Sequence, residues 1–171
     1  MRVHNQKMKK KWKASGITDA QALAIGYMTI NFNSMEQAVE SFISLIVSPR
    51  DFGLDKPLIS HLPFTAKIDV LEKLVKSLSE YYVPTAKNDA AYSHFVSRTK
   101  DLISKARALN KFRNSIIHWR YDAGNQETKV EVSAREIETR VSEMNDVAIE
   151  MMAHAIVVRT SDYSFSFGQQ F

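Results

Sequence analysis

Apolar residues recur at intervals of three and four along most of the chain, which is the spacing of a helix with one buried face. The first such stretch follows a possible cap at Thr18 or Asp19 and ends at about Val47, because Pro49 cannot continue a helix. The positions predicted to be buried in this helix are Ala24, Ile25, Met28, Phe32, Met35, Val39, Phe42, Ile43 and Ile46.

Three later stretches show the same spacing, over about residues 65–83, 88–119 and 133–158. The last of them opens with Ser133 and, three residues later, Glu136, which is the spacing of a capping box at a helix start. Four helices of these lengths around one core predict an all-α fold, a four-helix bundle.

The connecting segments are predicted to be largely irregular. Residues 49–64 contain three prolines and a glycine, and they form a loop longer than helix–helix connections usually need. Residues 119–121 (WRY) and 129–132 (KVEV) flank turn-forming residues and predict a short β-hairpin between the third and fourth long helices. Residues 161–171 alternate aromatic and polar side chains, which suits either an edge strand beside the hairpin or a segment packed on the bundle.

The net charge of +4 is concentrated in two regions. Residues 1–13 hold six Lys or Arg and no acid, and residues 95–120 hold seven bases and one acid, whereas the remaining segments are net acidic. We interpret residues 1–13 as a flexible basic arm, 14–160 as the helical domain and 161–171 as a C-terminal tail. A basic region suits a polyanion such as RNA. The alternative is a solvated helix face or, for the arm, disorder.

The chain has no cysteine, which excludes a disulfide scaffold, thiol catalysis and a Cys-ligated metal site. No apolar run is long enough to span a bilayer and no secretion signal is recognisable, so a cytoplasmic protein is expected. The histidines outside the third helix's end show no metal-ligand spacing, so no metal or cofactor is expected; they are His4, His61, His94 and His154.

Arg113 departs most clearly from the apolar pattern. At about 100° per residue it falls in the middle of the stripe that should face the core, formed by Leu102, Ala106, Leu109, Ile116 and Ile117. A guanidinium keeps its proton, so it must pair with a carboxylate there or face a water-filled cleft. Glu36 lies at the shoulder of the first helix's buried face, and we predict that it pairs with Arg113. The alternative is an Arg113 side chain that extends to water.

Asn114 and His118 complete a possible reactive cluster beside Arg113. They are four residues apart, so the amide can hold the imidazole in one orientation. An imidazole titrates near neutral pH and can move a proton, while a guanidinium can stabilise charge that develops on phosphate oxygens. This combination favours phosphodiester chemistry without a metal. The alternative for His118 is an imidazole that meets backbone carbonyls at the helix end.

Several neighbouring residues are candidates for RNA contacts. Basic side chains on this helix can bind phosphates, or simply form a solvated face; they are Lys105, Arg107, Lys111 and Arg120. Trp119 and Tyr121 can stack on unpaired bases, and the alternative for both is hydrophobic packing.

Residues 113–118, RNSIIH, resemble the R-N-x-x-x-H signature of the HEPN superfamily, small helical-bundle domains of toxin–antitoxin, phage-defence and RNA-processing systems. The resemblance extends to the layout of long helices over residues 18–158 and to the motif's place at the end of a late helix. Residues 33–36 are similar to the polar and acidic patch that many members carry opposite the motif, with Asn33 and Glu36 as supporting residues.

The resemblance implies a metal-independent endoribonuclease in which the RNA 2′-hydroxyl attacks the adjacent phosphate and leaves a cyclic phosphate end. It implies catalytic roles for Arg113 and His118, a supporting role for Asn114, and a homodimer whose two motifs share one cleft. It also implies a toxin or phage-defence effector with an antitoxin or another defence protein as partner. The alternative is a non-catalytic dimeric module that binds RNA, a nucleotide or a protein through the same cleft.

Overall fold

A computed structural model gives the fold, and the residues described are 17–47, 56–81, 89–122 and 132–160. These residues form helices and no strands, so the all-α prediction is confirmed for this part of the chain. The helices are α2 (Asp19–Val47), α3 (Lys56–Ser60), α4 (Phe64–Tyr81), α5 (Asp89–Asp122) and α6 (Ala134–Thr160).

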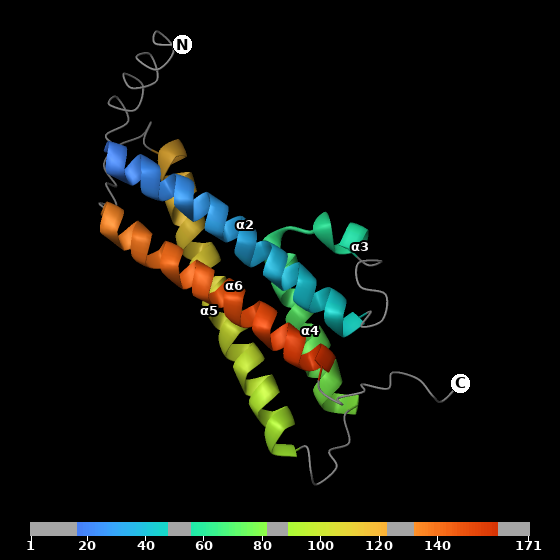
Figure 1. Ribbon diagram of the computed structural model, residues 1–171. Helices are drawn as coiled ribbons and strands as arrows, with labels where there is room; N and C mark the ends of the chain where they lie inside the picture. The colour runs from blue at the N-terminus through green and yellow to red at the C-terminus, as the bar shows by residue number, and fades with distance from the viewer. Residues whose placement is uncertain (1–16, 48–55, 82–88, 123–131, 161–171) are drawn as a thin grey trace.

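The four long helices pack as a bundle in which α2 and α6 lie side by side and run in the same direction (Figure 1). At their starts, Gln21 Nε2 donates to the carbonyl oxygen of Val132 at 2.8 Å. Near their ends, the rings of Phe42 and His154 are in contact. Helix α5 runs in the opposite direction, and α4 packs against both α2 and α5.

The helix starts follow the predicted caps. At the start of α2 the Thr18 hydroxyl accepts the Gln21 N–H at 3.1 Å, and Gln21 Oε1 accepts the Thr18 N–H at 2.9 Å. This reciprocal pair satisfies two backbone donors that a helix start otherwise leaves without partners. At the start of α6 the Ser133 hydroxyl accepts the Glu136 N–H at 3.1 Å. Side-chain chemistry readable in the sequence therefore sets both boundaries.

The core lies between α2, α5 and α6 and extends to α4. Most of the apolar positions predicted to be buried are buried; Ile25 and Ile117 are partly exposed. Phe42 of α2 is fully buried at the centre, with its ring edge-on to Phe95 of α5 at 6.2 Å between centroids. Burial of these side chains removes apolar surface from water, which is the main favourable term in folding.

Two local predictions differ from the structure. Part of the predicted loop 49–64 forms the short helix α3, which buries Ile59; Pro57 lies in its first turn, where a missing N–H costs no helical hydrogen bond. Helix α5 continues to Asp122, so residues 119–121 are helical and the prediction of a strand there was wrong. Residues 129–131 of the predicted hairpin, the basic arm and the C-terminal tail lie outside the described residues, and Val132 does not belong to a strand.

None of the described helices combines sufficient length with a sufficiently apolar sequence to cross a bilayer.

Candidate functional site

Arg113 lies on the face of α5 that packs toward α2, as its place in the apolar stripe predicts. It is partly exposed, and its guanidinium carbon lies 4.8 Å from the centroid of the Phe32 ring. Phe32 is 4% exposed and its ring packs against Phe64, the first residue of α4, at 4.8 Å between centroids. A cation over an aromatic face is attracted to the ring's π electrons. The guanidinium is therefore held at the edge of the core rather than inside it.

The guanidinium of Arg113 has a hydrogen-bond donor without a partner among the described residues. Its Nη1 donates to Asn114 Oδ1 at 3.0 Å, while its Nε is buried and has no hydrogen-bond acceptor in the described part of the chain. No carboxylate among the described residues lies within ion-pair distance of it, whereas each of Arg98, Arg107 and Arg140 has at least one. A buried donor without an acceptor costs free energy, so an oxygen-bearing anion that reached this group would gain from meeting it.

Glu36 does not pair with Arg113, and that prediction was wrong. Its carboxylate accepts from Nζ of Lys67 on α4 at 2.6 Å, and Glu40 accepts from the same ammonium at 2.6 Å. Lys67 is 2% exposed, against 26% for Glu36 and 12% for Glu40. Glu36 lies at the edge of the buried face of α2, as predicted from its angular position. The helix on that side is α4, however, and Glu36 pairs with Lys67 of α4.

Lys67 is the polar residue of this region that the sequence argument missed. Burial lowers the pKa of Lys67, but the hydrogen bonds and charges of Glu36 and Glu40 outweigh burial, so the pKa is raised above 10.5 and the ammonium stays charged. The signal was present in the sequence: Lys67 precedes Leu71 by four residues in the apolar stripe of α4. The test that singled out Arg113 would also have found it.

The remaining motif residues are placed only in part. The backbone of His118 belongs to α5, five residues and about 7.5 Å along the axis from Arg113. The side chains of His118, Trp119, Arg120 and Tyr121 lie outside the described residues. Asn114 accepts a hydrogen bond from Arg113, so within the described part the amide orients the guanidinium.

The other candidate RNA-binding residues do not gather at one place. Lys105 forms an ion pair with Asp101 at 3.2 Å and borders α6, whereas Arg107 bonds to Asp69 and Glu72 of α4 at 2.8 and 2.7 Å. Lys111 is exposed, and so is Asn33, the residue of α2 predicted to support the motif. Because Lys105 and Arg107 face different helices and already have carboxylate partners, neither extends the Arg113 site.

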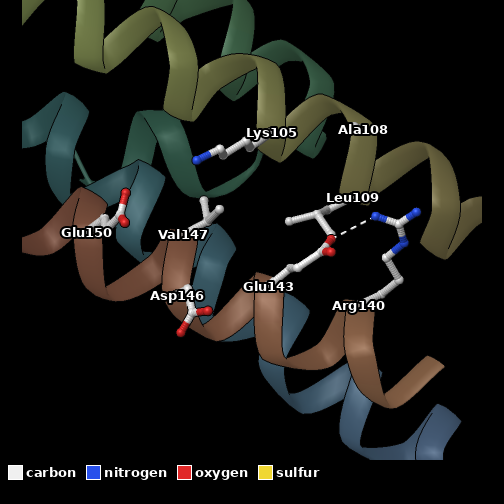
Figure 2. Close-up of a pocket in the computed structure, with 8 residues that line it drawn as sticks. All are labelled: Lys105, Ala108, Leu109, Arg140, Glu143, Asp146, Val147 and Glu150. Atoms are coloured by element: carbon white, nitrogen blue, oxygen red, sulfur yellow. Dashed lines mark hydrogen bonds and ion pairs between the residues drawn. The ribbon is translucent and has the colours of Figure 1, made fainter. Parts of the chain in front are cut away.

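A groove of about 400 Å³ lies between α5 and α6 (Figure 2). Its lining residues are Lys105, Ala108, Leu109, Arg140, Glu143, Asp146, Val147 and Glu150. Arg140 pairs with Glu143 at 2.8 Å within the groove, and Glu150 pairs with Arg98 just beyond it. Most of its charges are thus compensated internally, which makes it a weaker anion site than Arg113.

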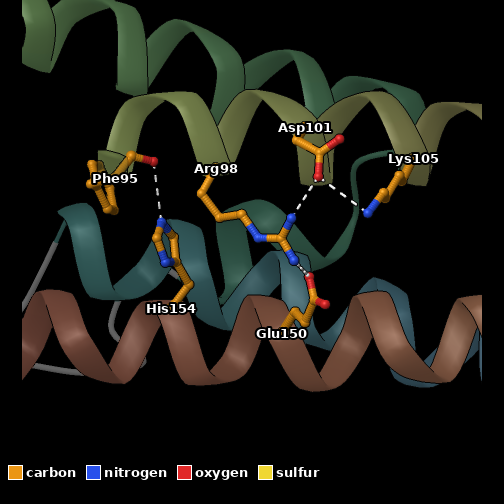
Figure 3. A network of polar contacts seen from close by, with 6 residues as sticks. All are labelled: Phe95, Arg98, Asp101, Lys105, Glu150 and His154. Atoms are coloured by element: carbon orange, nitrogen blue, oxygen red, sulfur yellow. Dashed lines mark hydrogen bonds and ion pairs between the residues drawn. The ribbon is translucent and has the colours of Figure 1, made fainter. Parts of the chain in front are cut away.

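A polar network joins α5 to α6 next to this groove (Figure 3). Arg98 bridges Asp101 on its own helix and Glu150 on α6, while His154 contacts the Phe95 carbonyl at 3.2 Å. The His154 ring also stacks on Phe95 at 4.8 Å. Burial lowers the pKa of His154 despite the bond to the Phe95 carbonyl, which favours the charged form. The network therefore fixes the packing of α5 on α6 with a neutral ring at neutral pH.

Among the described residues, no group of three or more His, Asp or Glu side chains is arranged to hold a metal ion. Comparison of the chain with protein-family models, with curated proteins and with solved structures found no match.

Proposed function

We propose that the protein is a metal-independent endoribonuclease of the HEPN type, with Arg113 as the phosphate-binding residue and His118 as the proton-transfer residue. One observation carries the proposal: the guanidinium of Arg113, held against Phe32, has a buried donor without an acceptor and no carboxylate partner among the described residues. An arginine held at a core edge without a counter-ion is suited to an anionic ligand.

The chemistry follows from these groups. The RNA 2′-oxygen bonds to the adjacent phosphorus as the bond from phosphorus to the 5′-oxygen breaks, which leaves a 2′,3′-cyclic phosphate and a 5′-hydroxyl. Arg113 stabilises the negative charge that builds up on the phosphate oxygens, and Asn114 holds its fork in place. His118 moves the proton between the 2′-hydroxyl and the leaving oxygen. None of these steps requires a metal ion.

Purified protein incubated with single-stranded RNA in EDTA tests the proposal. Cleavage is expected to persist in EDTA and to leave 2′,3′-cyclic phosphate ends, and an identically purified His118→Ala protein is expected to be inactive. That comparison excludes a contaminating nuclease. Binding of RNA by both proteins without cleavage by either would instead support a non-catalytic RNA-binding module and count against the enzyme.

We also propose that the active form is a homodimer built on the outer face of α2. Residues 20–35 contain no charged side chain, and three large apolar residues of this stretch are more than half exposed: Leu23 at 61%, Tyr27 at 52% and Ile30 at 62%. Ile149 of the neighbouring α6 is exposed at 59%. An uncharged apolar face of this kind is typical of interfaces between identical subunits.

Ile30→Arg is expected to weaken the dimer at least tenfold, because a two-fold interface would bring two copies of the new charge together. Analytical ultracentrifugation measures the change, with Leu58→Arg as the control, since Leu58 is 78% exposed on α3 and lies outside this face. A wild-type protein that sediments as a 19.5 kDa monomer at tens of micromolar would rule out the dimer.

A further inference from the structure

Helix α2 presents two neighbouring contacts to two different cations. Phe32 lies under the guanidinium of Arg113, and Glu36, one helical turn later, is bonded to the ammonium of Lys67. Residues four apart on a helix face the same way, about 5–6 Å between Cβ atoms. Phe32 and Glu36 therefore lie on the same side of α2, and among the described residues no ion pair joins the Glu36 carboxylate to Arg113.

The two cations compete unequally for Glu36. Lys67 is 2% exposed and bonds to two carboxylates, so its charge depends on both of them. Arg113 is partly exposed and its Nε–H has no acceptor among the described residues, so it is the group that would gain if Glu36 were released. An arginine that acquired this carboxylate would lose most of its attraction for an external anion.

We propose that Lys67 is a positioning residue that holds Glu36 away from Arg113 and so keeps the Arg113 guanidinium open to a phosphate group. This inference rests on the proposed anion-binding role of Arg113. The buried ion cluster of Lys67, Glu36 and Glu40, on α4 and α2, then controls the net charge at Arg113 on α5. Without Lys67, the Glu36 carboxylate forms an ion pair with the Arg113 guanidinium and cancels the charge that would bind a phosphate.

Two double variants of equal charge test the proposal. Lys67→Met/Glu36→Gln leaves Glu40 as the remaining carboxylate, and Lys67→Met/Glu40→Gln leaves Glu36. Of these two carboxylates, Glu36 is the nearer along α2 to Phe32, the residue under Arg113, and Glu40 lies one turn farther. A cluster that merely stabilised the fold would respond alike to both, because each variant removes one ammonium and one carboxylate.

The readout is the NMR signal of the Arg113 Nε–H, assigned with Arg113→Lys and titrated with inorganic phosphate. We expect the variant that keeps Glu36 to show a displaced Nε–H signal before any ligand is added and to bind phosphate about tenfold more weakly than wild type, a difference of about 1.4 kcal/mol. The variant that keeps Glu40 is expected to match wild type within about twofold. Lys67→Arg, which retains the cation, is expected to do the same.

The outcomes separate this inference from the nuclease proposal. Equal phosphate affinity in the two double variants, or no phosphate response of Arg113 in wild type, would overturn the role of Lys67 whatever the RNA assay shows. A wild-type protein that fails to cleave RNA but whose double variants differ as expected would remove the nuclease and leave the positioning role in place. Circular dichroism on both variants confirms that folded proteins are being compared.

Discussion

Replacing Arg113 by Ala is expected to lower the rate of RNA cleavage at least about 100-fold, because it removes the fixed charge proposed to stabilise the phosphate in the transition state. The free energy of unfolding is expected to stay within about 1 kcal/mol of wild type. The substitution loses a cation–π contact worth about 0.5–1 kcal/mol, but it also removes a buried donor that has no acceptor. Single-turnover cleavage and urea unfolding measure the two quantities.

Arg113→Lys is the informative companion to this variant. Lysine keeps the charge but lacks the planar fork that binds two phosphate oxygens at once, so we expect cleavage to remain at least about tenfold impaired. The opposite result for Arg113→Ala, a loss of several kcal/mol in stability with cleavage unchanged, would identify Arg113 as a structural residue and remove the basis of the nuclease proposal.

The contrast between Arg113 and Glu36 shows what the sequence can predict about such a site. Helical periodicity gives the angle of a side chain around its own axis, and it correctly brought Arg113 to the buried side of α5. It does not tell which helix lies on a given side, because that depends on how the helices pack. Glu36 was therefore assigned to the wrong cation, and Lys67, which lies on a third helix, was overlooked.

The boundaries of the helices were more predictable than which helices pack against one another, because boundaries depend on residues close together in the sequence. Caps and prolines act within a few residues, so the starts of α2 and α6 followed from Thr18 and Ser133. The end of α5 was missed because residues 119–121 favour strands only weakly when the preceding helix can continue its hydrogen bonds. The parallel pairing of α2 with α6 depends on contacts far apart in sequence, which local patterns do not encode.

Replacing Phe42 by Ala is expected to lower the free energy of unfolding by about 3–5 kcal/mol, the range for removing a buried aromatic ring from a well-packed core. Phe42 is 0% exposed, and its ring touches Phe95 of α5 and His154 of α6. The lost ring would leave a cavity where three helices meet, and a structure that relaxes only partly cannot refill it. Urea unfolding followed by circular dichroism measures the loss.

Two controls decide whether the cavity, rather than the loss of any apolar group, causes the effect. Phe42→Leu retains much of the volume and is expected to cost less than half as much free energy of unfolding. Leu23→Ala, on a side chain 61% exposed, is expected to cost under about 1 kcal/mol in the monomer.

Phe42 is ten residues from Phe32, about 15 Å along α2, so a folded Phe42→Ala protein is expected to keep its phosphate affinity. A Phe42→Ala protein as stable as wild type would mean that α2, α5 and α6 do not meet around this ring, and the placement of Arg113 over Phe32, which depends on the same packing of α5 on α2, would fall with it.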